Sequence, residues 1–120
     1  MDTTRWAVYE RSRETVQVVV AEQRKYDRVP VSFDVTCILA DEVEFDGSAR
    51  DISVGGMFVE CPKEMAFGVE LTLVLHGIAA KEVRVPAIVR WSEGGGFGVQ
   101  FGLLGAYATH AVVDLIKKNR

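Results

Sequence analysis

Residues 31 to 101 contain a repeated alternation in which every second side chain is apolar. The first run places four apolar side chains on one face of an extended chain: Val31, Phe33, Val35 and Cys37. Three more runs share this period: Val69 to Leu75, Val83 to Trp91 with Arg84 and Arg90 facing outward, and Phe97 to Phe101. A period of two is typical of strands that bury one face. Because such strands must cover one another and a closed sheet has no exposed edges, we expect a β-barrel.

Turn-forming residues separate these runs. They are Asp41 and Glu42, Gly55 and Gly56, Pro62 to Gly68, Gly77 to Ala80, and Glu93 to Gly96. Most of these connections are short, which favours antiparallel neighbours. Pro86 lies inside a strand pattern and cannot donate to a ladder, so we predict an edge position or a bulge there. The glycines from 94 to 98 lie between two strand patterns and precede no helix, which indicates a hairpin and not a nucleotide-binding loop.

The two ends of the chain follow other patterns. Near the C-terminus the apolar residues take helical spacing: Ala108, Ala111, Val112, Leu115 and Ile116. We predict a helix that covers one end of the barrel, with basic residues in its last turn complementing the helix dipole. Residues 1–23 form an N-terminal extension whose structure the sequence leaves open. Val16, Val18 and Val20 alternate as in a strand, whereas the segment around Trp6 and Tyr9 fits a short helix equally well.

Length and composition limit the function classes. A chain of 120 residues forms one core, and 48% hydrophobic with 26% charged residues is typical of a globular domain. The net charge of −3 argues against a general nucleic-acid binder. No apolar stretch approaches the roughly 20 residues that cross a membrane, and the N-terminus lacks the apolar segment of a signal peptide. We therefore expect a cytoplasmic protein without membrane insertion.

The chain offers little for metal or catalytic chemistry. Cys37 and Cys61 are too few for a disulfide framework and lack the spacing of a metal site. His76 and His110 are far apart in sequence, with no acidic or cysteine cluster beside them. No nucleophile lies beside a base, and no paired carboxylates are visible. We expect no metal, no cofactor, no catalytic residues and no enzymatic activity.

Two short motifs point to an anionic ligand. Arg24 and Arg28 form an R-x-x-x-R array, and Asp51, Ser53 and Gly56 form a D-x-S-x-x-G array. Two guanidinium groups can bind phosphate oxygens or the O6/N7 edge of guanine, while a carboxylate can accept hydrogen bonds from guanine N–H groups. A glycine lets a flat ligand approach the backbone closely. Together the residue types indicate a site for guanine nucleotides.

The two arrays and their surroundings resemble the PilZ domain family. The resemblance covers residues 24 to about 117 and includes RKYDRVPVSFDV, ARDISVGGMFVE, IVRWSEGGGFGVQF and the terminal apolar helix. It implies a mainly β fold, a six-stranded antiparallel β-barrel of the split-barrel type with a C-terminal α-helix packed at one end. We expect this domain to span residues 24–120. Family members with intact motifs are bacterial receptors for the second messenger cyclic di-GMP.

The resemblance also implies roles for the motif residues. Arg24 and Arg28 would bind guanine edges and phosphates, Asp51 would accept from the guanine N1 and N2 hydrogens, and Ser53 would bond phosphate or base. Gly56 would supply clearance. The output would be a conformational change of the N-terminal arm that is passed to an unidentified protein effector in motility, exopolysaccharide synthesis or development.

An alternative stays open at this stage. A PilZ-fold adaptor of pilus or gliding machinery would contact its protein partner without binding nucleotide, although the intact arginines favour the receptor. A nucleotide-turnover enzyme would need a catalytic constellation that the sequence lacks. The sequence also leaves open whether the protein is a monomer or a homodimer, and whether one or two nucleotides bind.

Overall fold

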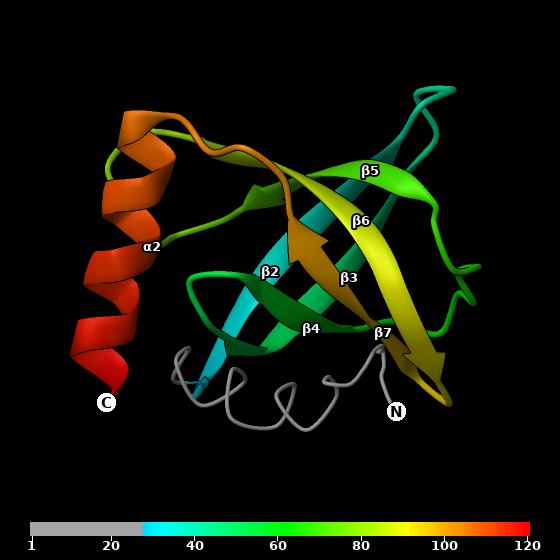
Figure 1. The fold of residues 1–120 in the computed structure, drawn as a ribbon, viewed down its shortest axis with the longest axis horizontal. Coiled ribbons are helices and arrows are strands. Elements are labelled where there is room, and N and C mark those ends of the chain that lie inside the picture. The colour runs from blue at the N-terminus through cyan, green and yellow to red at the C-terminus, as the bar shows by residue number, and fades with distance from the viewer. Residues whose placement is uncertain (1–27) are drawn as a thin grey trace, which may run out of the picture.

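The computed structural model describes residues 28–120, which form a closed barrel of six strands and one helix (Figure 1). The strands are β2 (Val29–Leu39), β3 (Glu44–Ile52), β4 (Gly56–Glu60), β5 (Glu70–Leu75), β6 (Val83–Glu93) and β7 (Gly96–Phe101). Around the barrel they follow the order β2, β3, β4, β7, β6 and β5, and β5 pairs with β2 to close it. All six pairings are antiparallel, as the short connections predict. The predicted fold is confirmed.

The inward side chains fill the barrel as the alternation predicts. Val35 and Cys37 are buried on β2, as are Leu71 and Leu73 on β5. These residues belong to one continuous apolar cluster that includes residues of every strand and of the helix. A closed sheet leaves no unpaired edge, so the burial of one face of each strand defines the whole core.

The C-terminal helix α2 (Ala106–Asn119) packs against the barrel, where it contacts β6 and β2. Figure 1 shows it standing at one side of the barrel. Its buried residues follow helical spacing: Ala108, Ala111, Val112 and Ile116. Lys117 and Lys118 lie in the last turn, where positive charge stabilises the helix dipole. No helix in the described part of the chain has the length and apolarity needed to span a bilayer.

Pro86 lies at a local edge of the barrel, in line with the prediction from its missing N–H. The pairing between β6 and β7 ends at Ala87 and Phe101, so β6 continues past the end of β7 at Pro86. The carbonyl of Pro86 accepts a hydrogen bond from the Gly102 amide at 2.8 Å. Because the N and C=O of a strand residue point the same way, the proline nitrogen also faces Gly102, one residue past the end of β7, where the β6–β7 ladder needs no further donor.

The glycines after Glu93 form a hairpin, as expected. Glu93 pairs with Gly96, and the turn between them contains Gly95 in the left-handed region at φ 88°. This conformation strains most side chains but not glycine. The segment is therefore a hairpin connection between β6 and β7.

One assignment from the alternation is wrong. Trp91 was predicted on the inner face of its strand, but a bulge between Val89 and Trp91 places it on the outer surface, where it is 45% exposed. Val89 pairs with Val99 and Trp91 pairs with Gly98, so Arg90 is the extra residue. A one-residue insertion reverses which face the following side chains occupy.

Candidate functional site

A second bulge lies in β3, on the other side of the β4–β7 pair, and it also turns the following residue to the outer face. In β3, Ala49 pairs with Val59 and Asp51 pairs with Phe58, so Arg50 is the extra residue. Ala49 and Ile52 are buried, while Asp51 lies on the outer surface beside Phe58. The bulges in β3 and β6 therefore turn Asp51 and Trp91 toward the same outer face.

These residues form one line across the barrel. Asp51 on β3 pairs with Phe58 on β4, which pairs with Gly98 on β7, which pairs with Trp91 on β6. We call these four residues the transverse row. Asp51 also pairs with Pro30 on β2, two residues after Arg28. The strand order thus brings residues from three distant parts of the sequence onto one surface.

Arg28 and Asp51 form an ion pair at the β3 end of this row. The Arg28 Nη2 atom donates to the Asp51 Oδ1 atom at 2.8 Å, and the two side chains are 48% and 36% exposed. An ion pair this exposed contributes about 0–1 kcal/mol to stability, so a ligand can rearrange it at little cost. The sequence motifs are therefore in contact through Arg28 and Asp51. Arg24 lies outside the described residues.

Ser53 organises the connection between β3 and β4. Its side chain is 2% exposed, and its Oγ atom accepts from the Gly55 and Gly56 amides, both at 3.2 Å. The same hydroxyl donates to the Gly56 carbonyl at 3.3 Å. Three backbone partners use the bonding capacity of a hydroxyl group. In this structure Ser53 holds the turn, and its direct contact with a ligand stays a prediction.

Gly56 allows two strands to approach each other closely. A Cβ atom built on Gly56 would lie 2.1 Å from the Val99 carbonyl oxygen of β7. Any side chain here would push β4 and β7 apart. The structure thus gives this motif glycine a role in strand packing, and the clearance for a ligand stays a prediction.

An aromatic shelf occupies the transverse row from β4 to β6. The rings of Phe58 and Trp91 stack with centroids 5.2 Å apart and an interplanar angle of 22°. They lie over two glycines, because Cβ atoms on Gly96 and Gly98 would fall 2.4 Å from Phe58 and 2.3 Å from Trp91. We call Phe58 and Trp91 the aromatic shelf. Flat, partly exposed rings of this kind offer a stacking surface to a nucleobase.

A hollow of about 640 Å³ opens between the ion pair and the shelf. Three strands and the turn after β3 contribute to it, and two of its lining side chains are arginines. The lining residues are Arg28, Ser53, Gly55, Gly56, Arg90, Trp91, Val99, Gln100 and Phe101. Three of the five motif residues predicted from the sequence line this hollow, and Asp51 is bound to it through Arg28. Cationic, apolar and backbone groups therefore converge here, as in typical small-molecule sites.

A second hollow has the opposite charge. It measures about 540 Å³ and is lined by Asp34, Asp46 and Glu60, together with His76, which bonds the Thr36 hydroxyl at 2.8 Å. An anion would be repelled by these carboxylates and attracted by Arg28 and Arg90 in the first hollow. No group of three or more potential metal ligands exists among residues 28–120.

Both cysteines are buried, and the Cys37 thiol is a poor nucleophile. Cys37 and Cys61 are both free and buried in the core. Burial, with smaller contributions from Cys61 and Asp46, raises the pKa of the Cys37 thiol from 9.0 to about 12. A thiol with this pKa is almost wholly protonated at neutral pH, and the protonated form is unreactive.

Sequence reasoning missed three lining residues of the first hollow. The alternation predicts Arg90 on the outward face and Trp91 in the core, and it makes no prediction for Gln100. The available signal was Gly98, since a glycine in a strand indicates the close approach of another group. That group is the Trp91 ring.

Comparison with known proteins gives a consistent picture. A family model described as the PilZ domain matches residues 22–117. Among solved structures, the PilZ domain of CeSA from a cellulose-synthesizing bacterium is 19% identical, with a TM-score of 0.64 over 77% of this chain and 96% of that one. The PilZ domain of YcgR from Escherichia coli with c-di-GMP is 16% identical, with a TM-score of 0.63 over 81% and 91%. The Bacillus subtilis inhibitor of motility MotI/DgrA is 21% identical, with a TM-score of 0.65 over 80% of this chain and 50% of that one. No curated protein sequence matches this chain.

Proposed function

The chain belongs to the PilZ domain family, whose model matches residues 22–117, and we propose that it is a cytoplasmic receptor for cyclic di-GMP that signals to a protein partner. The observation that carries this proposal is the ion pair of Arg28 and Asp51 beside the aromatic shelf, on one outer face of the barrel. A guanine nucleotide presents flat bases, acceptor edges, N–H donors and anionic phosphates. The hollow offers a matching group for each of these.

The proposed contacts follow from residue chemistry. Arg28 donates to guanine O6/N7 or to phosphate, and Asp51 accepts from the guanine N1 and N2 hydrogens. Trp91 stacks on a base. Ser53 holds the turn between β3 and β4, and Gly56 sets the spacing between β4 and β7. Both roles help to position Asp51 at the end of β3. Arg24, four residues before Arg28 in the sequence, supplies the second guanidinium.

The proposed output is a conformational shift and not a reaction. Arg28 directly precedes β2, so a ligand that recruits its guanidinium also changes the path of the chain before the barrel. A ligand can shift such an equilibrium only by its differential affinity for the two conformations. We expect the shift to alter a surface that a protein effector recognises, in motility, exopolysaccharide synthesis or development. The domain itself acts as an adaptor without catalysis.

Calorimetric titration of the full chain tests the proposal. Cyclic di-GMP should give saturable heat, whereas GTP and cyclic di-AMP at the same concentrations should not. Arg24→Ala and Arg28→Ala should each weaken binding by about tenfold or more, because a bidentate contact to guanine discriminates by about 1–3 kcal/mol. Arg84→Ala is the matched control, since Arg84 pairs with Glu82 and does not line the hollow.

One outcome would overturn the receptor, and another would overturn the proposed site. The first is the absence of saturable heat with cyclic di-GMP, which would leave the adaptor that acts without nucleotide. The second is unchanged affinity in both Arg24→Ala and Arg28→Ala, which would place the nucleotide elsewhere on the protein.

A further inference from the structure

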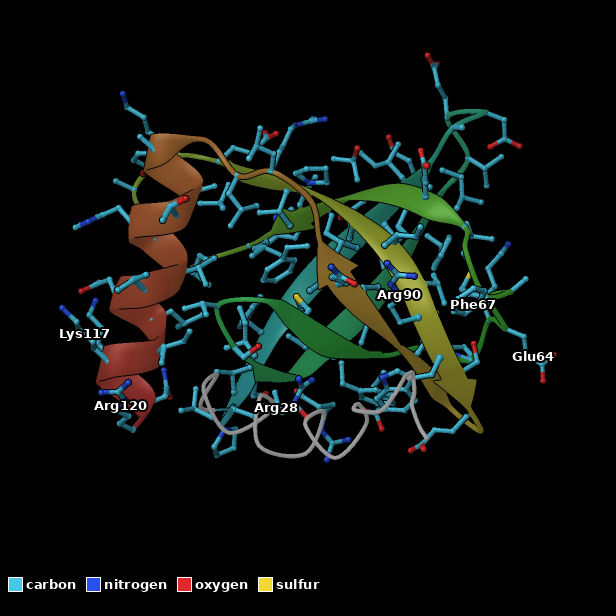
Figure 2. The ribbon with its side chains drawn as sticks, viewed as in Figure 1. Arg28, Glu64, Phe67, Arg90, Lys117 and Arg120 are labelled. Atoms are coloured by element: carbon cyan, nitrogen blue, oxygen red, sulfur yellow. The ribbon has the colours of Figure 1, made fainter. Side chains whose placement is uncertain are left out.

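Arg90 is the second arginine of the hollow, and it belongs to neither the R-x-x-x-R array nor the D-x-S-x-x-G array. It lies on β6 as the extra residue of the bulge, immediately before Trp91, and its side chain is exposed. Figure 2 shows it on β6 beside β7, with Phe67 next to it and Arg28 below β4. Arg90 on β6 and Arg28, directly before β2, thus line the same hollow from distant parts of the chain.

The charge of Arg90 is not neutralised within the described chain. Arg28, Arg50 and Arg84 each pair with a carboxylate. Arg90 has no carboxylate partner among residues 28–120, and its hydrogen bond goes to a neutral amide, from Nε to the Gln100 Oε1 atom at 2.8 Å. The two terminal Nη groups accordingly keep their donors for a partner outside residues 28–120.

Two neighbours set the orientation of this guanidinium. The Gln100 amide fixes the Nε edge, and the Phe67 ring lies beside the group, with 5.8 Å between the Arg90 Cζ atom and the ring centroid. Gln100 itself pairs with Gly56 across β7 and β4, at the floor of the hollow. A cation held by a neutral amide and an aromatic ring retains its full charge while losing rotational freedom.

We propose that Arg90 binds a phosphodiester oxygen of the nucleotide whose base stacks on Trp91. This inference rests on the proposed function. Arg90 directly precedes Trp91 and lines the same hollow, and a charge-assisted contact from a guanidinium to phosphate is about twice as strong as a neutral hydrogen bond. Arg28 with Asp51 then serves the base edge, and Arg90 serves the phosphate.

Titration of full-length variants with cyclic di-GMP tests the assignment. Arg90→Ala should weaken binding by about tenfold, while Arg90→Lys should recover most of that loss because a phosphate accepts a point charge. Arg50→Ala is the matched control, since Arg50 is also the extra residue of a bulge but pairs with Glu60 and does not line the hollow. Its affinity should equal that of the parent. Thermal unfolding of each variant verifies that the barrel is intact.

The outcomes separate this inference from the receptor itself. If the parent protein binds cyclic di-GMP and Arg90→Ala binds equally well, Arg90 has no contact with the ligand. If Arg90→Ala and Arg90→Lys are equally weak, the contact needs a planar fork and is made to the base edge, which overturns the phosphate assignment. If the parent gives no saturable heat, the receptor proposal fails and this inference fails with it.

Discussion

The two bulges of the barrel are alike in geometry and different in charge. Each adds one arginine to its strand, Arg50 in β3 and Arg90 in β6, and each turns the next residue toward the outer face. Arg50 pairs with the Glu60 carboxylate at 2.8 Å, whereas Arg90 bonds only a neutral amide within the described chain. The same kind of bulge therefore carries an arginine paired with a carboxylate on β3, and on β6 an arginine with no carboxylate partner among residues 28–120.

This difference separates the backbone geometry of the bulges from the charge that each bulge presents. The bulges themselves are structural, because they place Asp51 and Trp91 on the transverse row whichever partner the arginines have. The partner decides whether the arginine can serve a ligand. Substitutions that disturb the backbone should therefore affect both the β3 and the β6 side of the row. Substitutions that change one side chain should affect only ligand binding or only local stability.

The largest effect is expected at Gly56, where β4 lies closest to β7. Gly56→Ala places a Cβ atom 2.1 Å from the Val99 carbonyl oxygen, and backbone atoms cannot move aside as a side chain can. The free energy of unfolding should fall by about 3 kcal/mol, measured by chemical denaturation. Gly55→Ala is the matched control, since nothing lies within 4 Å of its added Cβ atom. Equal stability of the two variants would show that β4 and β7 can separate without cost.

The next effect concerns the β6 side of the row. Trp91→Ala removes the stacking surface beside Arg90, and a base–aromatic stack contributes about 1–3 kcal/mol. The affinity for cyclic di-GMP should therefore fall by about tenfold to a hundredfold in a calorimetric titration. Tyr107→Ala is the control for general loss of an exposed ring, since Tyr107 on α2 is 43% exposed and does not line the hollow. An unchanged affinity in Trp91→Ala would remove the shelf from the site.

The sequence predicts the barrel well because its alternation directly encodes which face of each strand is buried. Leu71 and Leu73, or Phe97 and Val99, are apolar where the core needs them. The motif spacing also indicates partners correctly, since Arg28 and Asp51 lie in contact although 23 residues separate them. Both features depend on residue type and period, which a sequence displays.

The remainder of the site depends on register, which residue types alone do not display. An alternating run gives no sign of a single inserted residue, so Trp91 reads as a core residue when Arg90 is counted in phase. The residues of the D-x-S-x-x-G motif also have different structural roles, which the sequence does not reveal. Ser53 bonds the backbone of the turn, and Gly56 allows β4 to approach β7. These roles follow from the hydrogen-bond partners of Ser53 and from the short distance between a Cβ atom on Gly56 and the Val99 carbonyl oxygen.

A smaller effect is expected from the carboxylate on the β3 side. Asp51→Asn replaces one acceptor oxygen by an NH₂ donor that faces the guanine N–H groups, so the affinity for cyclic di-GMP should fall by about tenfold. Glu60→Gln is the matched control on the neighbouring ion pair and should bind like the parent. A loss in both variants would indicate that general negative charge, and not the Asp51 contact, supports binding.

The smallest effect is expected for Arg50, the arginine that is paired with a carboxylate and does not line the hollow. Arg50→Ala removes an ion pair whose side chains are 56% and 53% exposed, and exposed pairs contribute about 0–1 kcal/mol. The free energy of unfolding should therefore fall by less than about 1 kcal/mol, and less still at high salt, because salt screens exposed charges. Chemical denaturation at low and high salt measures this difference. A loss of several kcal/mol would mean that the Arg50–Glu60 pair holds the β3 bulge in place, and the two bulges would then differ in backbone energetics as well as in charge.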